Sequence, residues 1–307
     1  MKILITGSKG MVGSNVAEIL GKDNNIRLLL PSHSELDLCD ARQLEKYLIN
    51  NSPDLIIHTA GKVGGIQANV QDPLSFFIEN LDMGKNIVGV AYKLGIRNVI
   101  NLGSSCMYPR GHETPLDEAL ILKGELEPTN EGYALAKVVV AKYCEYITKE
   151  NIGYNYITLI PCNLYGKGDK FDSLNSHMIP NVIRKLHEAK INRVDCVDIW
   201  GSGKARREFM YVEDLANVIH KAIYMMDDLP TYMNVGLGYD LSITDYYHAI
   251  AKIVGYNGNF SYDLTKPEGM QRKLVDVSLQ KTMGLYFETS LEEGLEKTYK
   301  YFLEKYY

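Results

Sequence analysis

The chain has 307 residues, enough for one large domain or for two smaller domains that share a core. Hydrophobic residues make up 46% and charged residues 23%, as in ordinary globular proteins, and the net charge is −5. This acidic balance, with no basic block, argues against nucleic-acid binding. No apolar run approaches the roughly 18 residues that a membrane helix needs. We therefore expect a globular protein that binds neither nucleic acid nor membranes.

The cysteines and histidines carry no metal or disulfide pattern. The five cysteines have no Cys-x-x-Cys spacing and are odd in number, which favours a reducing compartment. The seven histidines are scattered without the spacing of metal ligands, so we predict no metal site. The first predicted strand, residues 2–6, starts almost at the initiator methionine and leaves no room for a signal peptide. We expect a cytoplasmic location.

A glycine-rich loop follows the first strand. Glycines at 7, 10 and 13 lie between the apolar run Ile3–Ile5 and a predicted helix over residues 14–20. Such glycines allow a tight turn, a close approach of the backbone to a pyrophosphate, and close packing of helix on strand. The start of the helix then offers free N–H groups to phosphate. We predict a dinucleotide site, and its cofactor-binding residues here are Gly7, Lys9, Gly10, Met11, Val12 and Gly13.

The end of the second predicted strand, residues 26–30, bears on the choice of cofactor. NAD-preferring sites place an acid near this end to hold the ribose hydroxyls. Here the first carboxylate is Glu35, whereas Lys9 and His33 can face a 2′-phosphate. This pattern favours NADP. We expect Asp37 and Leu38 to line the adenine pocket, ahead of a helix over residues 41–49.

The next elements alternate strands and helices. A predicted strand at 54–58 ends in the small residues Ala60 and Gly61, which let a cofactor lie across the strand's carboxyl end. The loop 62–69 that follows is a candidate substrate contact. Further on we predict a helix over 76–94 and strands over 98–102 and 156–160. This alternation predicts a doubly wound α/β fold of the Rossmann type, with a parallel sheet.

Tyr133 and Lys137 lie four residues apart on a predicted helix that continues to Tyr146. They therefore share one face, one turn from each other. An ammonium near a phenol favours the phenolate, so a pKa of about 10 would move toward neutrality and suit proton transfer. Alone this pair is weak evidence, because the same spacing is common on helix surfaces.

After residue 166 the alternation loosens. Residues 167–211 are expected to be loops around one helix at 178–188, followed by a helix at 212–226 and a strand at 232–236. The tail from Ser242 is expected to be mostly helical. An irregular lobe over the strand ends would form the second wall of a cleft. We therefore expect two parts: a dinucleotide-binding domain of residues 1–165 to which 212–236 return, and a smaller mixed substrate-binding lobe of residues 166–211 and 237–307.

At this point several motifs match a known family. The glycine loop, a serine at 104 and the Tyr133/Lys137 pair together resemble the extended short-chain dehydrogenase/reductases. Over essentially its whole length, in the same order, the chain resembles the GDP-L-fucose synthases, which epimerise GDP-4-keto-6-deoxy-mannose at C3 and C5 and reduce it at C4. The blocks that carry this resemblance are Gly103–Pro109, Glu127–Lys137, Asn175–Pro180, Lys62–Ile66, Trp200–Gly203 and Arg207–Phe209.

The resemblance implies roles for particular residues. Ser104 and Tyr133 would hydrogen-bond the 4-keto oxygen, and Lys137 would bind the nicotinamide ribose. Cys106 and His177 would be the base and the acid of epimerisation. Further cofactor contacts would come from His33, Asp37, Leu38, Ala60, Gly61, Lys137, Pro161, Asn163, Leu164 and His177. Substrate contacts would come from Lys62, Ser105, Asn163, Lys185, Trp200 and Arg207.

The chemistry of a 4-keto sugar agrees with these roles. The ketone acidifies the C–H bonds at both C3 and C5, so one base can serve both through an enediolate. A thiol with a pKa near 8.5 takes such protons once its pKa is lowered. Positioned proton transfer contributes roughly 10²–10⁴-fold, and stabilisation of the oxyanion contributes a comparable or larger factor. The same tyrosine then protonates O4 during reduction by NADPH.

Some departures leave alternatives open. Lys9 and His33 replace the family's cofactor-facing arginines, and Arg184-Lys185 stands where a pair of arginines is expected. The substrate can therefore be a related GDP-4-keto-6-deoxy-heptose of surface polysaccharides, and some such relatives only reduce. Ser105-Cys106 replaces the Asp-Glu pair of nucleotide-sugar dehydratases, which argues against that activity. A simple 4-epimerase and a non-catalytic NADP-binding sensor also remain. By analogy we expect a homodimer with the Tyr133 helix at its interface.

Overall fold

The computed structural model describes residues 1–112, 115–172, 176–266, 269–286 and 289–307. Asn175, the first residue of the predicted Asn175–Pro180 block, lies outside these ranges.

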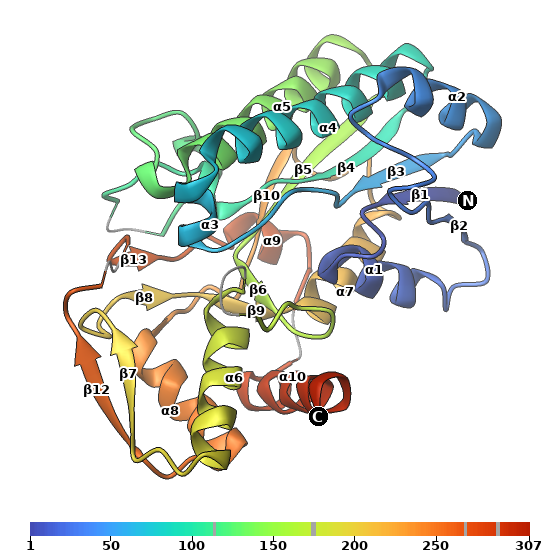
Figure 1. Cartoon of the computed structure of the whole chain (residues 1–307). Helices are drawn as coiled ribbons and strands as arrows, with labels where there is room; N and C mark the ends of the chain where they lie inside the picture. Colours follow the sequence, from blue (N-terminus) through green and yellow to red (C-terminus); the bar gives the residue numbers. More distant parts are fainter. Residues whose placement is uncertain (113–114, 173–175, 267–268, 287–288) are drawn as a thin grey trace.

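A six-stranded sheet forms the centre of the molecule (Figure 1), and its strands follow the order β10-β5-β4-β3-β1-β2. All five neighbouring pairs are parallel, so each connection must cross over the sheet. The strands are β1 Lys2–Thr6, β2 Arg27–Leu29, β3 Leu55–His58, β4 Asn98–Leu102, β5 Asn155–Pro161 and β10 Tyr232–Val235. The predicted doubly wound α/β fold is confirmed.

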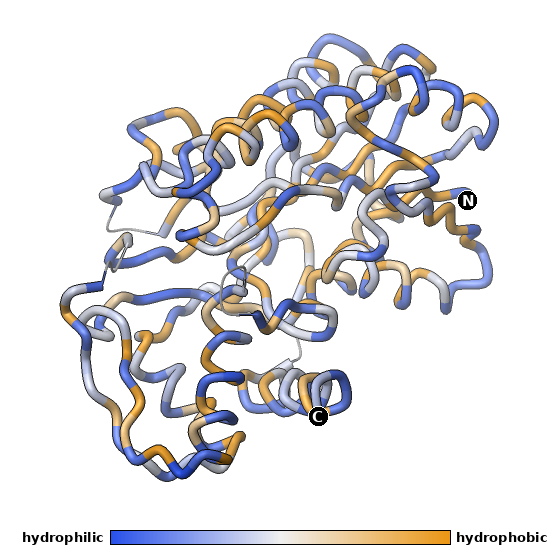
Figure 2. Tube along the Cα trace, in the orientation of Figure 1, coloured by the Kyte–Doolittle hydropathy of each residue, from blue (hydrophilic) through white to orange (hydrophobic). Residues whose placement is uncertain are grey.

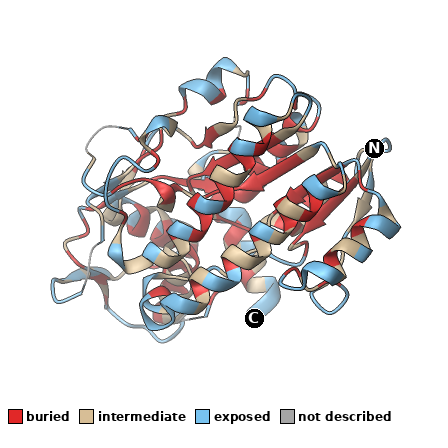
Figure 3. Ribbon diagram, turned by 90° about the horizontal axis from the view of Figure 1, so that it is seen from above, coloured by how far each residue is buried: buried red, intermediate tan, exposed pale blue. Residues whose placement is uncertain are grey.

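Helices cover both faces of this sheet, which explains why its central strands are apolar throughout. Side chains alternate between the faces: Ile3 and Ile5 join one buried core, and Leu4 joins the other. Figure 1 shows α2, α4 and α5 on one side, and α1 and α7 on the opposite side. Their bounds, with that of α3, are α1 Met11–Leu20, α2 Ala41–Asn51, α3 Ile66–Gln71, α4 Pro73–Lys93, α5 Glu131–Glu150 and α7 Val212–Ala222. Seen from above (Figure 3), the strands are buried beneath the helices.

The strand order reverses between β1 and β3, because the chain leaves β1 toward one edge and continues from β3 toward the other. In open α/β sheets ligands bind beside the carboxyl ends of the strands at such a switch point. Here those ends lead into Gly7 and Thr59-Ala60-Gly61, the two segments predicted to hold the cofactor. Three short 3₁₀ helices, η1 Ser105–Met107, η2 Glu118–Leu120 and η3 Pro128–Asn130, lie between β4 and α5.

The remaining segments build a smaller lobe with its own apolar core (Figure 1). Its helices are α6 Met178–Ile191, α8 Ile243–Val254 and α10 Leu291–Tyr306, whereas α9 Ser278–Thr282 packs against β10 of the large sheet. Its strands are β7 Cys196–Trp200, β8 Arg206–Arg207, β11 Leu241–Ser242, β12 Asn259–Asp263 and β13 Arg272–Lys273. The paired strands β6 Asn163–Tyr165 and β9 Phe209–Tyr211 lie at the junction, with residues in both cores.

The expectation that residues 167–211 are loops around one helix is wrong. Three strands lie there, and each pairs with a distant segment: β7 with β12, β8 with β11 and β13, and β9 with β6. Strands of two to five residues with remote partners leave no local alternation to detect. The tail from Ser242 is helical in part but also contains β12 and β13.

The return of β10 to the large sheet, and of α7 to the core beneath it, supports the predicted division of the chain. We propose the same two parts, residues 1–165 with 212–236, and residues 166–211 with 237–307. Along α4 and α5 hydrophobic and hydrophilic residues alternate (Figure 2), as in helices with one buried face. In the described part of the chain no helix is long and apolar enough to cross a membrane.

Candidate active site

The glycine loop packs tightly against the end of β3. Gly7 has φ +68°, and a Cβ there would lie 2.7 Å from the Cα of Ala60. A Cβ on Gly13 would lie 2.3 Å from the carbonyl oxygen of Gly7, so only glycine fits both positions. Helix α1 begins at Met11 with no side-chain cap, and the first N–H groups of a helix have no partner within it. The loop therefore fits a pyrophosphate laid across the start of α1.

The acid in the loop after β2, Glu35, is engaged in local hydrogen bonds. The Glu35 carboxylate accepts hydrogen bonds from the N–H and hydroxyl of Ser32, at 2.8 and 2.7 Å. These bonds, with the charge of Lys9 adding to them, lower the pKa of Glu35. Lys9 and His33 are both exposed, and Lys9 lies close enough for its charge to act on Glu35. The Asp37 carboxylate accepts the Cys39 N–H at 2.9 Å. The positive charge of Lys9 in this region is compatible with binding of the 2′-phosphate of NADP.

Ser104, Cys106 and Tyr133 come together beyond the carboxyl end of β4. Ser104 caps η1 by accepting the N–H of Cys106 at 3.2 Å, and its hydroxyl also hydrogen-bonds the oxygen of Tyr133. Ser105 is buried within the same 3₁₀ turn. Lys137, one turn along α5, is buried and donates to the carbonyl oxygen of Leu102 at 2.9 Å. The predicted serine, cysteine, tyrosine and lysine therefore lie at one site.

The expectation that Lys137 lowers the pKa of Tyr133 does not hold in this structure. Burial first, and then the charge of Cys106, raise the pKa of Tyr133 above its usual value, with the bond from Ser104 acting the other way. Lys137 lies over the face of the ring, with Nζ 5.9 Å from its centroid. Burial lowers the pKa of Lys137 itself to about 8. Tyr133 is thus a protonated phenol at neutral pH, the form that donates a proton.

The thiol of Cys106 has two partners that the sequence did not point to. Asn130 Nδ2 donates to its Sγ at 3.1 Å, and Lys273 Nζ lies 3.3 Å from the same atom. Burial works toward a higher pKa for Cys106, but the charge of Lys273 and hydrogen bonds from Ser104, Lys273 and Asn130 outweigh it and lower that pKa. Lys273 is 167 residues from Cys106 and in none of the blocks that carry the resemblance, and Asn130 lies within the Glu127–Lys137 block but was given no role of its own.

His177 stands at the first position before α6, where its side chain makes no capping bond. Burial, and then the charge of Lys170, lower its pKa, so the imidazole is neutral near pH 7. A Cβ on Gly65 would lie 3.3 Å from the carbonyl oxygen of Ser176, which brings the 62–65 loop against the start of α6. Lys62 turns its ammonium toward α4, where it pairs with Asp72 at 3.1 Å and Glu79 at 3.0 Å.

The other predicted substrate residues belong to the small lobe. Arg207 lies close enough to Glu127 and Cys106 for their charges to act on its guanidinium. Lys185 pairs with the Asp198 carboxylate at 2.8 Å, and Trp200, 43% exposed, has Lys266 Nζ 5.4 Å from a ring centroid.

The predicted cofactor-binding residues Pro161, Asn163 and Leu164 lie at the end of β5 and directly after it. Asn163 Nδ2 donates to the carbonyl oxygen of Glu208 at 2.9 Å, and Leu164 packs on the sheet's core. Pro161 is the last residue of β5, paired with Val235. These contacts hold Pro161, Asn163 and Leu164 where the large sheet meets the lobe.

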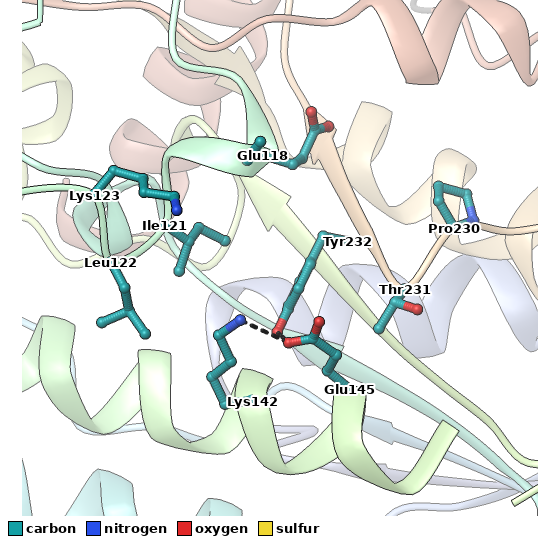
Figure 4. A pocket seen from close by; sticks show the side chains of 10 residues that line it. Glu118, Ile121, Leu122, Lys123, Lys142, Glu145, Pro230, Thr231 and Tyr232 are labelled. Atoms are coloured by element: carbon teal, nitrogen blue, oxygen red, sulfur yellow. Dashed lines mark hydrogen bonds and ion pairs between the residues drawn. The ribbon is translucent and has the colours of Figure 1, made fainter. Parts of the chain in front are cut away.

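A cavity of about 570 Å³ lies elsewhere, beside α5 and the start of β10. Figure 4 shows Lys142, Glu145 and Tyr232 meeting on its wall; Glu145 binds Lys142 and Tyr232, each at 2.7 Å. Its lining contains none of the predicted site residues, so it is separate from the site at Cys106.

A parallel sheet with a glycine loop at its switch point, and a Tyr-x-x-x-Lys pair beside a serine, define a nucleotide-dependent enzyme of the short-chain dehydrogenase/reductase class. The chain belongs to the NAD-dependent epimerase/dehydratase family, whose pattern matches residues 3–236.

Three relatives narrow the comparison. The chain is 51% identical to a GDP-L-colitose synthase of Yersinia pseudotuberculosis over 99% of both chains. It is 46% identical to a GDP-L-fucose synthase of Azorhizobium caulinodans, covering 98% of this chain and 96% of the relative. Among solved structures, a GDP-mannoheptose C4 reductase of Campylobacter jejuni with NADP bound superimposes with a TM-score of 0.89 at 29% identity, over 98% of each chain. The predicted resemblance to GDP-L-fucose synthases is confirmed.

Proposed function

We propose that this protein is an NADPH-dependent enzyme that epimerises a GDP-4-keto-6-deoxy sugar at C3 and C5 and reduces it at C4. The observation that carries the proposal is the gathering of Ser104, Cys106 and Tyr133 within one hydrogen-bonded cluster. One site then offers two hydroxyl donors to a carbonyl oxygen and a thiol to the neighbouring carbons. The GDP-sugar named for each of the three relatives agrees with this substrate class.

The cofactor would occupy the switch point between β1 and β3. Gly7 fits closely against Ala60 and Gly13 against Gly7, so a pyrophosphate can approach the start of α1, where the N–H groups of Met11, Val12 and Gly13 would bind it. Lys9 and His33, exposed after β1 and β2, are suited to a 2′-phosphate. NADPH bound there would supply the hydride that reduces C4.

Epimerisation rests on Cys106. Its thiolate would take the proton from C3 or C5, forming S–H while the electron pair of the broken C–H bond moves to O4. Ser104 and Tyr133, which already share a hydrogen bond, would stabilise the negative charge on O4. His177 would deliver the proton to the opposite face of the carbon from its imidazolium form, which the lowered pKa makes the minor form near pH 7, and return to neutral imidazole.

Reduction uses the same oxygen site. Because the pKa of Tyr133 is raised, its phenol keeps a proton to give to O4. Lys137, held over the face of the Tyr133 ring by its hydrogen bond to the Leu102 carbonyl, would bind the nicotinamide ribose and orient the reacting face. Arg207, Lys185 and Trp200 in the lobe would bind the GDP group, with Lys62, Ser105 and Asn163 nearer the sugar.

An exposed apolar stripe supports the homodimer. Leu74 and Ile78 of α4 are 71% and 42% exposed, and Leu135, Val139 and Tyr146 of α5 are 37%, 47% and 57% exposed. On α5 these positions recur at intervals of four and seven, so they share one face. Monomers seldom expose a contiguous apolar surface of this kind, and a second copy of the chain would cover it.

The test is turnover of GDP-4-keto-6-deoxy-mannose, followed as loss of NADPH absorbance and identification of the product. An L-configured GDP-6-deoxy sugar is expected. Failure to oxidise NADPH with any GDP-4-keto sugar would reject the proposal and favour a non-catalytic NADP-binding sensor. The likeness to a GDP-mannoheptose C4 reductase supports one further candidate, reduction alone on a GDP-4-keto-6-deoxy-heptose. That activity would yield a product with unchanged configuration at C3 and C5.

A further inference from the structure

Two short strands of the lobe, β8 and β13, carry four cationic side chains beside the active site, and two of these face the Cys106 thiol. In the parallel pair β8–β13, Arg206 lies opposite Arg272, and Arg207 lies opposite Lys273. Neighbouring residues of a strand point to opposite faces. The first pair therefore occupies one face of this small sheet and the second pair occupies the other.

The first pair is held by one buried carboxylate. Arg206 Nε donates to Asp240 Oδ1 at 2.7 Å, and Arg272 Nε donates to Oδ2 at 2.5 Å. Asp240 is only 5% exposed, so both of its oxygens are committed to these strands. This clamp fixes the alignment of β13 beside β8.

The second pair faces the thiol. Lys273 Nζ lies 3.3 Å from Cys106 Sγ, and the charge of Cys106 acts on the Arg207 guanidinium. The other groups around the sulfur come from the large domain. Asn130 of η3 donates to the sulfur at 3.1 Å, Ser104 accepts the Cys106 N–H, and Tyr133 lies close enough for the charge of Cys106 to act on it. Lys273 hydrogen-bonds this sulfur, and its charge acts to lower the pKa of Cys106.

We propose that Lys273 is a positioning residue that holds Cys106 as a thiolate, so that the small lobe supplies the positive charge that keeps this base ionised. An ammonium at this distance stabilises the anionic sulfur and leaves the neutral thiol unaffected. Lys273 takes no proton from the sugar; it acts through Cys106 alone. Epimerisation therefore depends on the lobe strand β13, whereas proton donation by Tyr133 belongs to the large domain.

The inference rests on the proposed function for its meaning, but its test needs neither cofactor nor sugar. The free enzyme is alkylated with iodoacetamide across a pH series, and mass spectrometry of the Cys106 peptide separates it from the exposed Cys39 and Cys196. In the unaltered enzyme the midpoint should fall below the value of about 8.5 for a free thiol. Lys273→Gln, which keeps a donor but loses the charge, should raise that midpoint by at least about one unit, which is roughly tenfold less thiolate at pH 7.

Matched variants separate charge from structure. Lys273→Arg should keep the low midpoint, and Lys252→Met, which removes a surface lysine paired with Glu292, should leave the profile unchanged. Lys273→Met, which also removes the donor, should behave as Lys273→Gln does. A Lys273→Gln profile that superimposes on that of the unaltered enzyme would overturn the proposal, and so would an equal shift in Lys252→Met.

A second measurement connects the thiolate to catalysis. With the oxidised cofactor present, deuterium uptake at C3 of a GDP-4-keto sugar at pH 7 should fall in Lys273→Gln by the same factor as alkylation. If Lys273→Gln raises the alkylation midpoint of Cys106 but leaves the deuterium uptake normal, the inference is overturned. A clear midpoint shift with no turnover of any GDP-4-keto sugar would instead reject the proposed function and leave the role of Lys273 intact.

Discussion

Replacing Gly13 by alanine tests the glycine loop most sharply. The new Cβ would lie 2.3 Å from the Gly7 carbonyl oxygen and 2.7 Å from the Thr59 hydroxyl oxygen. Since a carbon rarely approaches a carbonyl oxygen closer than about 3.3 Å, the loop must move by about 1 Å. Overpacking of this kind costs about 1–3 kcal/mol of the free energy of unfolding.

The same displacement moves the N–H groups at the start of α1 away from the pyrophosphate. A hydrogen bond to a charged group contributes about 1.5–3 kcal/mol, so the loss of one should weaken NADPH binding roughly 10- to 100-fold. Titration calorimetry measures the affinity, and thermal unfolding without cofactor measures the stability. Gly89→Ala in α4, where the new Cβ meets the Tyr143 hydroxyl at 3.1 Å, is the control that should leave affinity unchanged. If Gly13→Ala binds NADPH as tightly as the unaltered chain does, the loop does not cradle the cofactor.

Three further outcomes follow from the site, and one from the surface. Tyr133→Phe should lower the rate of reduction by roughly 10²–10⁴-fold, measured as NADPH oxidation at saturating substrate. Lys9→Met should raise the KM for NADPH by about fivefold at low salt and leave that for NADH unchanged, because only NADPH carries the 2′-phosphate. The pKa of Asp240 is lowered in the folded protein, because hydrogen bonds from Arg272 and Arg206 outweigh the opposing effect of burial. The ionised carboxylate therefore stabilises the fold fully above its unfolded pKa of about 3.9, and this stabilisation is lost as the pH falls through the folded pKa. Asp240→Asn should therefore lower the free energy of unfolding by about 1–3 kcal/mol at pH 7, and the difference should shrink below about pH 4 in urea titrations. Val139→Glu should convert the dimer to monomer in sedimentation.

For each of these predictions, one result would contradict the reasoning behind it. If Tyr133→Phe reduces the substrate as fast as the unaltered enzyme does, Tyr133 is not the proton donor. If Lys9→Met changes the KM values for NADPH and NADH equally, Lys9 does not bind the 2′-phosphate. A stability difference for Asp240→Asn that persists unchanged at pH 3 would mean that the carboxylate charge is not what clamps β8 to β13. Sedimentation of the unaltered chain as a monomer at micromolar concentration would contradict the dimer itself.

The central sheet could be predicted from the sequence because each of its strands carries its own evidence. Apolar runs such as Ile3–Ile5 are bounded by glycines or turns, and each must be buried on both faces whatever its neighbour is. The lobe strands carry no such signal. Arg206–Arg207 and Arg272–Lys273 form strands only because they pair with each other, 66 residues apart in the register, and with β11.

The catalytic residues of the large domain and several residues of the lobe were predicted, whereas the contacts of Lys273 and Asn130 with the Cys106 thiol were missed. Ser104, Cys106, Tyr133 and Lys137 lie in segments with recognisable spacing, and the structure brings them together. Lys273 reaches Cys106 through tertiary folding alone, so no local pattern could indicate it. The direction of the Tyr133 pKa also could not be read from the spacing to Lys137, since burial and the nearby thiol decide it.

The most direct test of the two-reaction site is turnover of GDP-4-keto-6-deoxy-mannose with NADPH in D₂O, with the product examined by NMR. We predict an L-configured product with deuterium at both C3 and C5, and loss of that deuterium when Cys106 is replaced by alanine. Reduction without deuterium at either carbon would contradict epimerisation by this enzyme. Normal incorporation in Cys106→Ala would contradict the assignment of Cys106 as the base.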